Sequence, residues 1–172
     1  MTTLTAIDPT TGAVVREVPA ATPQEITEII DRAQEAFTTW GSTSIAERAA
    51  VLRRVATHLR EHTDELAPLM TEEMGKPAGE AHGEVAKSAW AAEHYAEHAE
   101  SYLADEHLDS DATSSYVQYL PLGPVLGILP WNAPFWVAFR FCAPALMAGN
   151  TCVMKHDPHV PGCAAALEEV FR

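Results

Sequence analysis

The stretch Val125-Leu126-Gly127-Ile128-Leu129-Pro130-Trp131-Asn132-Ala133-Pro134 decides the fold of this 172-residue chain. Its first five residues are a continuous apolar run, which predicts a β-strand buried on both faces. The next five form a turn in which two prolines restrict the backbone around Trp131 and Asn132. A rigid turn directly after a buried strand predicts that the chain crosses over into a helix.

The elements after this turn predict a parallel sheet. Helices are expected over about 135–148, where Gly149-Asn150 ends the run, and over about 160–171. Thr151-Cys152-Val153-Met154 lies between them and predicts a second buried strand. Strand, helix, strand and helix in close succession indicate a βαβ unit of the α/β class. Two strands make an incomplete sheet, so the chain is expected to end before such a sheet would.

The first 113 residues are expected to be mostly helical. Two short strands should flank the turn Asp8–Gly12, because Pro9 and Gly12 suit a tight turn. Thr22 and Ser44 each stand three residues before a glutamate, a capping-box pattern that predicts a helix start. Two more helices are expected over about 64–74 and 78–103. An acidic loop should follow at 105–113 and a strand at 115–120, because these segments are polar and β-rich respectively.

The composition excludes several classes of protein. The chain carries 24 acidic and 11 basic side chains, a net charge of −13, and its pI is about 4.9. Nucleic acid and anionic membranes require a basic surface, so neither is an expected partner. Apolar residues make up 47% of the chain, too many for a disordered acidic tail.

The cysteines and the apolar runs predict a cytoplasmic protein. Three widely spaced cysteines (Cys142, Cys152 and Cys163) suit neither a disulfide framework nor a zinc site, and are expected to be buried thiols. The N-terminus shows no signal-peptide pattern. The longest apolar run, 135–148, is too short to span a bilayer and contains Arg140.

The turn after the first buried strand is the leading candidate for a site. Ligands of open parallel sheets bind at the carboxyl ends of the strands, where Trp131 and Asn132 are expected. The amide of Asn132, held between two prolines, could donate to a developing oxyanion. The alternative is that Asn132 only caps the next helix and Trp131 only packs.

Two basic residues could join this site. Lys155 closes the second strand, where its ammonium could reach a ribose hydroxyl or a phosphate, or could simply be solvated. Arg140 lies in an apolar helix about two turns beyond Asn132, where it should need an anionic partner. A substrate carboxylate would suit the guanidinium. An acidic residue of the chain is the alternative partner.

Other patterns carry little weight. Gly123-Pro124-Val125-Leu126-Gly127 precedes its strand and is not the G-x-G-x-x-G fingerprint of dinucleotide-binding proteins. The pairs His58/His62 and His94/His98 have helical spacing, but no third ligand is evident, so no metal site is expected.

These residues together resemble the NAD(P)-dependent aldehyde dehydrogenases. Residues 123–134 resemble the family's Pro-Trp-Asn segment, and 144–155 resemble its next segment at the family's spacing. The chain also matches at 8–12, at Arg48 and at 72–77. The resemblance implies the N-terminal part of that fold: a helical half, an incomplete parallel βαβ cofactor-binding sheet and an oligomerisation strand.

The same resemblance divides the chain into three parts. Residues 1–113 would supply the N-terminal strands and helices of the cofactor-binding domain. Residues 114–122 would be a strand of the oligomerisation arm, and 123–172 an incomplete Rossmann-like βαβα segment. The full-length protein would then be a homo-oligomer.

Within the family, the chain is most similar to bacterial succinate-semialdehyde dehydrogenases. Phe135-Trp136, Lys155-His156 and Arg140 carry that similarity. By this resemblance, Arg140 would bind the far carboxylate of succinate semialdehyde, and Asn132 would be the oxyanion donor.

The resemblance also assigns cofactor contacts. Trp131 would line the cofactor cleft with its backbone, and Lys155 would bind the adenosine ribose. Pro158 stands where the family often has a glutamate that favours NAD or a small residue that tolerates NADP, so the choice between NAD and NADP stays open.

The resemblance leaves the chain short of a complete catalytic set. The family's nucleophilic cysteine, general-base glutamate and glycine-containing cofactor loop all lie beyond the matched segments. The 172 residues alone are therefore expected to be inactive. The alternatives are a non-catalytic fragment that associates with other chains, a fragment that does not fold stably, and an aldehyde dehydrogenase for another aldehyde.

Overall fold

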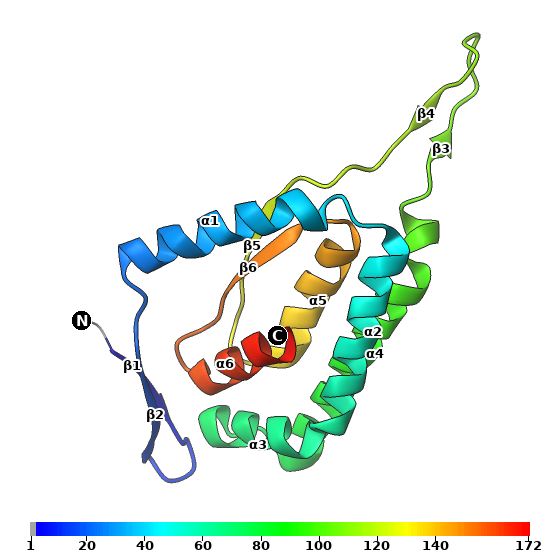
Figure 1. The fold of residues 1–172 in the computed structure, drawn as a ribbon. Helices are drawn as coiled ribbons and strands as arrows, with labels where there is room; N and C mark the ends of the chain where they lie inside the picture. The colour runs from blue at the N-terminus through cyan, green and yellow to red at the C-terminus, as the bar shows by residue number, and fades with distance from the viewer. Residues whose placement is uncertain (1–2) are drawn as a thin grey trace.

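The computed structural model describes residues 3–172, which form six helices and three two-stranded sheets (Figure 1). The elements in chain order are β1 (Thr3–Ile7), β2 (Val14–Pro19), α1 (Pro23–Trp40), α2 (Ile45–Glu61), α3 (Thr63–Met74), α4 (Ala78–Tyr102), β3 (Glu106–His107), β4 (Tyr116–Val117), β5 (Pro124–Ile128), α5 (Pro134–Met147), β6 (Thr151–Lys155) and α6 (Pro161–Val170). Helices α2 and α4 run side by side, and α5 packs between them and the β5–β6 sheet (Figure 1).

The local signals for the first two helices are confirmed. The side chain of Thr22 accepts a hydrogen bond from the backbone N–H of Glu25, and the Glu25 carboxylate accepts one from the N–H of Thr22. Ser44 and Glu47 make the same reciprocal pair at the start of α2. Each box satisfies two N–H groups that the helix itself leaves without acceptors.

The predicted βαβ unit is also confirmed. Strands β5 and β6 pair in parallel, with Val125 opposite Cys152 and Ile128 opposite Lys155, and α5 connects them. Gly127 allows α5 to approach the sheet, because a Cβ there would lie 2.7 Å from the Phe141 ring. The parallel register brings the carboxyl ends of both strands to one edge, where the site residues were expected.

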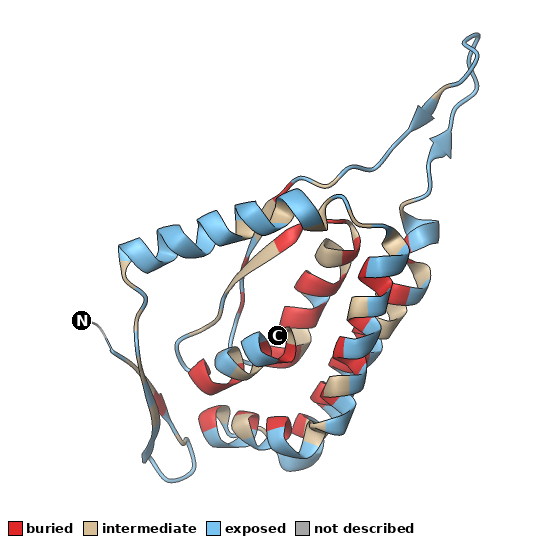
Figure 2. Cartoon of the chain, viewed as in Figure 1, coloured by how far each residue is buried: buried red, intermediate tan, exposed pale blue. Residues whose placement is uncertain are grey.

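One contiguous core holds these elements together. Its largest fully buried side chains include Phe135 and Phe139 of α5, Leu52 and Leu59 of α2, and Met70 of α3. Figure 2 shows the buried residues gathered where α2, α4 and α5 meet. Alanines on the inner face of α4 let these helices approach closely, as their spacing in the sequence indicates.

The expected strand at 115–120 and the expected loop at 105–113 both need correction. The segment at 115–120 forms only a two-residue strand, β4, and its partner β3 lies inside the stretch expected to be a loop. The two strands form a hairpin that projects from the body (Figure 1). Its strands lie outside the core that residues 3–172 form, so the β-rich composition produces only a short ladder there.

The predicted burial of β5 on both faces is wrong for the described residues. Within the described part of the chain, Leu126 is 63% exposed and Ile128 is 74% exposed. Helix α1 similarly buries none of its residues fully (Figure 2). No helix in the described part of the chain combines the length and the apolarity needed to cross a bilayer.

Candidate active site

The turn after β5 and the end of β6 lie against each other. The backbone N–H of Leu129 donates to the carbonyl of Lys155 at 2.9 Å, which continues the ladder to the edge of the sheet. Asn132 follows three residues after Leu129, so its loop and Lys155 leave the sheet at the same edge. The structure therefore brings these two predicted site residues to one side of the molecule.

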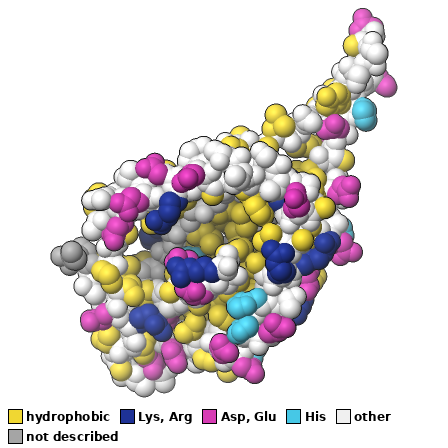
Figure 3. Space-filling view, viewed as in Figure 1, with side chains coloured by type: hydrophobic (Ala, Val, Ile, Leu, Met, Phe, Trp, Pro, Cys, Tyr) yellow, Lys and Arg dark blue, Asp and Glu magenta, His cyan; other side chains and the backbone are white. Residues whose placement is uncertain are grey.

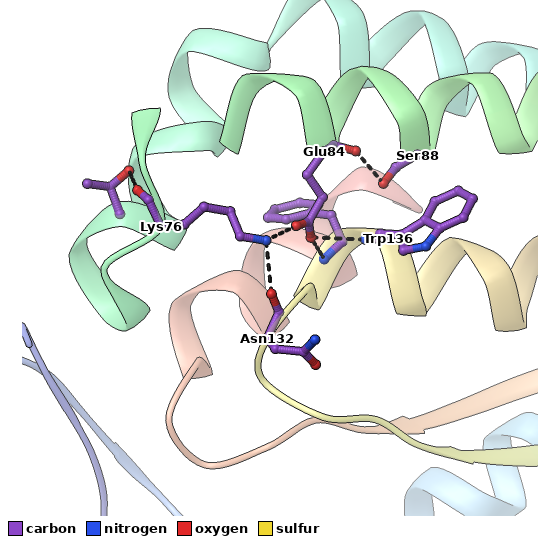
Figure 4. Close-up of polar contacts among 7 residues, drawn as sticks. Lys76, Glu84, Ser88, Asn132 and Trp136 are labelled. Carbon is purple, nitrogen blue, oxygen red and sulfur yellow. Dashed lines mark hydrogen bonds and ion pairs between the residues drawn. The ribbon is translucent and has the colours of Figure 1, made fainter. Parts of the chain in front are cut away.

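Asn132 does not cap helix α5, which was the alternative role for this residue. The N-cap position is Ala133, and no side chain of the loop bonds to the first turn. Glu84, a buried residue of α4, performs that function instead: its Oε1 accepts from the N–H groups of Phe135 at 2.9 Å and Trp136 at 3.1 Å (Figure 4). The Asn132 side chain is thus left available at the exposed edge.

Lys76 completes this buried cluster. Its ammonium forms an ion pair with Oε2 of Glu84 and donates to the backbone carbonyl of Asn132 at 2.9 Å. The side chains of Lys76 and Glu84 are only 10% and 7% exposed. Both charges are therefore neutralised by direct pairing, as burial of an ion requires.

Sequence reasoning missed Lys76 and Glu84 as functional residues. A signal for Glu84 was present, because it lies three residues after Ala81 and four before Ser88, on the buried stripe of α4. An acidic residue on such a stripe needs a buried partner. The spacing of residues along α4 could not show which partners Glu84 has, because the lysine and the two backbone amides belong to other segments.

The predicted cofactor-binding residues are all accessible. Trp131 is 45% exposed, and both Lys155, the last residue of β6, and Pro158 in the loop after it are exposed. Lys155 forms no ion pair with any residue between 3 and 172. Figure 3 shows a hollowed face with hydrophobic side chains inside it and basic side chains around it. Such a face suits a ligand with apolar and anionic parts.

Arg140 lies on the exposed side of α5, so the expectation that apolar surroundings force it to take a partner is wrong. Its guanidinium lies 5.9 Å from the centre of the Trp136 ring, and the ammonium of Lys87 lies 4.0 Å from the same ring. Arg140 borders a shallow hollow with Val137 and Phe141. Within the described residues it pairs with no carboxylate, which leaves its charge free for a ligand.

The sequence profile of the family described as "Aldehyde dehydrogenase family" matches residues 1–172. This chain belongs to the aldehyde dehydrogenase family. Its fold is the N-terminal part of the aldehyde dehydrogenase fold, as the resemblance implied. A solved succinic semialdehyde dehydrogenase from Streptococcus pyogenes, in complex with NADP+, superposes with a TM-score of 0.93 at 33% identity. The match covers 98% of this chain and 37% of that one.

Two curated relatives are more similar in sequence. A protein of Synechocystis sp., named as a probable succinate-semialdehyde dehydrogenase using NADP(+), is 45% identical over 169 residues. A succinate-semialdehyde dehydrogenase of Mycobacterium tuberculosis strain H37Rv, also named with NADP(+), is 43% identical over 171 residues. Each match covers 98% of this chain, and the chain spans 37% of the length of each relative.

The cysteines of this aldehyde dehydrogenase chain are poorly suited to act as nucleophiles. All three are free thiols, and Cys142 and Cys163 are buried. Burial raises the pKa of the Cys152 thiol to about 12, and it also raises the pKa of Cys142 and Cys163. A nucleophilic cysteine needs a lowered pKa, so these thiols have the character of core residues.

A second buried carboxylate supports the loop after β6. Glu73 of α3 accepts from the N–H groups of Gly162 at 2.6 Å and Cys163 at 3.0 Å, at the start of α6. Arg16 of β2 donates to the same carboxylate at 3.2 Å. Glu73 was also missed in the sequence, although its spacing from Met70 and Leu66 places it on the buried side of α3.

Proposed function

We propose that the whole protein to which this chain belongs oxidises succinate semialdehyde to succinate with NAD or NADP. The observation that carries the proposal is the free amide of Asn132 at the carboxyl edge of the parallel sheet. Glu84 caps α5 in its place, so the capping role no longer competes with a catalytic one. Membership of the aldehyde dehydrogenase family supports the reaction class.

In the proposed reaction, a cysteine thiolate adds to the aldehyde carbon and the carbonyl oxygen becomes an oxyanion. The amide of Asn132 donates a hydrogen bond to that oxygen. Oxidation of this carbon to a thioester would need a hydride acceptor, which the cofactor would supply, and a water molecule activated by a glutamate would then release succinate and the thiol. The thiolate and the glutamate would come from parts of the protein outside residues 1–172, as the resemblance implies.

The residues at the sheet edge fit a dinucleotide. The cofactor supplies a hydride acceptor when bound. Lys155 offers the adenosine ribose an ammonium that forms no ion pair within residues 3–172, and Trp131 lies half exposed beside the same edge. Pro158 adds no carboxylate that would repel a 2′-phosphate. We propose NADP as the preferred cofactor, supported by the names of the Synechocystis and Mycobacterium relatives.

Arg140 is the proposed anchor for the substrate carboxylate. Its guanidinium is exposed, lies near the aromatic ring of Trp136 and pairs with no acidic side chain in the described chain. Arginine binds carboxylates with two parallel hydrogen bonds, which gives orientation as well as attraction. This distinguishes succinate semialdehyde from uncharged aldehydes.

The projecting β3–β4 hairpin is the proposed site of homo-oligomer formation. Tyr116, Val117, Tyr119 and Leu120 on this segment are all more than 40% exposed. Exposed apolar side chains on a projecting hairpin suit burial against a second copy. We further propose that the protein works in the cytoplasm, where three free thiols are expected.

The experiment is a rate measurement on the full-length protein, with succinate semialdehyde and butanal as substrates and NADP or NAD as cofactor. Wild type should reduce the cofactor faster with succinate semialdehyde. Asn132→Ala should lower kcat about a hundredfold or more. A faster reaction with butanal would favour another aldehyde as substrate. A folded, oligomeric protein with no activity on either aldehyde would favour the non-catalytic alternative.

A further inference from the structure

We propose that Lys76 and Glu84 are positioning residues that hold the oxyanion donor Asn132 in place. The inference rests on the function proposed above. It concerns a buried ion pair to which neither the family resemblance nor the sequence pattern assigns a role. The residues come from three separate segments: the short loop after α3, the inner face of α4 and the turn after β5.

The geometry separates two tasks between the two oxygens of Glu84. Oε1 accepts from the backbone N–H groups of Phe135 and Trp136, so it fixes the first turn of α5. Among the described residues, Oε2 receives only the ammonium of Lys76, which in turn donates to the carbonyl of Asn132 at 2.9 Å. In Figure 4 the backbone carbonyl of Asn132 points toward Lys76, and its side chain points away.

This arrangement holds the backbone of Asn132 at one atom while leaving its amide free. The carbonyl carbon is bonded directly to the Cα of Asn132, so fixing the carbonyl fixes the origin of the side chain. The prolines at 130 and 134 restrict the turn on both sides. An oxyanion donor acts only when it is already aimed at the position where charge develops.

Capping of α5 by Glu84 does not by itself explain why Lys76 is buried beside it. A neutral acceptor on α4 would satisfy the two N–H groups without burying a second charge. Lys76 is itself braced: Thr71 Oγ1 donates to its carbonyl at 2.7 Å, and Gly75 before it adopts a φ of 72°. A braced, nearly buried ammonium whose remaining bond goes to Asn132 is suited to positioning that residue.

The test uses the full-length protein and two sets of changes. Lys76→Met together with Glu84→Gln removes both charges, so no ion is left buried without a partner. The amide oxygen of the new glutamine can still accept from the N–H groups of Phe135 and Trp136. Of the bonds that the ion pair makes to backbone groups, only the one to the Asn132 carbonyl is lost. The same pair of changes is then made in an Asn132→Ala background. Arg60→Met is the control, because Arg60 forms an exposed ion pair with Glu93 of α4.

The expected result is a loss that depends on Asn132. The Lys76→Met/Glu84→Gln protein should lose about tenfold or more in kcat, with KM for succinate semialdehyde changed less than about twofold. In the Asn132→Ala background the same changes should alter kcat by less than about twofold, because there is no longer a donor to position. Arg60→Met should match wild type.

The possible failures are distinct. If wild type has no aldehyde-oxidising activity, the proposed function falls and the inference falls with it. If wild type is active and Asn132→Ala is impaired, but the paired changes lower kcat equally in both backgrounds, the role of the pair is structural and the inference alone is wrong. Unchanged kcat in the paired variant overturns it as well. If the paired variant does not fold, Lys76→Gln alone is measured under the same criteria.

Discussion

Replacing Glu73 with alanine should selectively loosen the start of helix α6. The carboxylate is fully buried, with its side chain 0% exposed, and it accepts from the N–H groups of Gly162 and Cys163. Helix α6 has no capping side chain of its own, because its N-cap residue is Val160. Alanine therefore leaves two buried N–H groups without an acceptor.

The magnitude follows from those two groups. A buried donor that loses its acceptor costs about 1–3 kcal/mol, so two cost about 2–6 kcal/mol. Arg16, the third partner, adds little, because its side chain is 38% exposed and can return to water. Glu93→Ala is the matched control, since it removes a carboxylate that pairs with Arg60 at the surface, worth about 1 kcal/mol or less.

The assay is hydrogen exchange of the full-length protein, read by mass spectrometry on peptides that cover α6 and α2. In Glu73→Ala the α6 peptide should exchange about 30-fold faster or more, since about 1.4 kcal/mol corresponds to tenfold. The α2 peptide should change little, as should both peptides in Glu93→Ala. Equal exchange of α6 in the two variants would refute the claim that Glu73 holds this helix.

Three further predictions concern the edge of the sheet and its packing. Arg140→Ala should raise KM for succinate semialdehyde about tenfold or more and leave KM for butanal nearly unchanged. Steady-state rates measure both constants, and an equal effect on the two aldehydes would contradict a role for Arg140 in binding the carboxylate. Pro158→Glu should shift the ratio of kcat/KM from NADP toward NAD by about tenfold, because a carboxylate near a 2′-phosphate repels it; an unchanged ratio would remove this position from the cofactor site. Gly127→Ala should destabilise the protein by about 1–3 kcal/mol, because the added Cβ would lie 2.7 Å from the Phe141 ring. The midpoint of thermal unfolding measures this change, and an unchanged midpoint would show that the ring can move aside.

Local signals predicted most of the elements. The capping boxes at Thr22 and Ser44 depend on residues three apart in the chain, and both form as expected. The βαβ unit followed from apolar runs and turn residues within about 30 positions, a range in which composition alone is informative. Burial was harder to predict. Leu126 and Ile128 have the composition of a fully covered strand, but coverage depends on elements elsewhere in the fold.

The sequence predicted only those candidate site residues whose role follows from their place in a single segment. Asn132 and Lys155 stand at strand ends, so position in the sequence was enough to select them. Glu84 and Glu73 act on amides 51 and 89 residues away, respectively. Their positions on buried helix faces indicate only that each needs a partner. The identity of that partner is a property of the tertiary fold.

The two buried carboxylates together satisfy the starts of both helices at this edge without using side chains of the loops. Helices α5 and α6 both begin with proline, which has no N–H, and in each the next two N–H groups bond to a glutamate from another helix. The following N–H, of Val137 or Ala164, already reaches the carbonyl of the N-cap residue. No donor in either first turn is left for a phosphate, the usual ligand of a helix N-terminus in dinucleotide-binding folds. This agrees with the absence of a G-x-G-x-x-G sequence before α5, and at these two helix starts it leaves only side chains to contact a ligand. Because Glu84 and Glu73 cap the helices from outside, Asn132 in one loop, and Lys155 and Pro158 before the other, need not serve as caps and can face a substrate or cofactor.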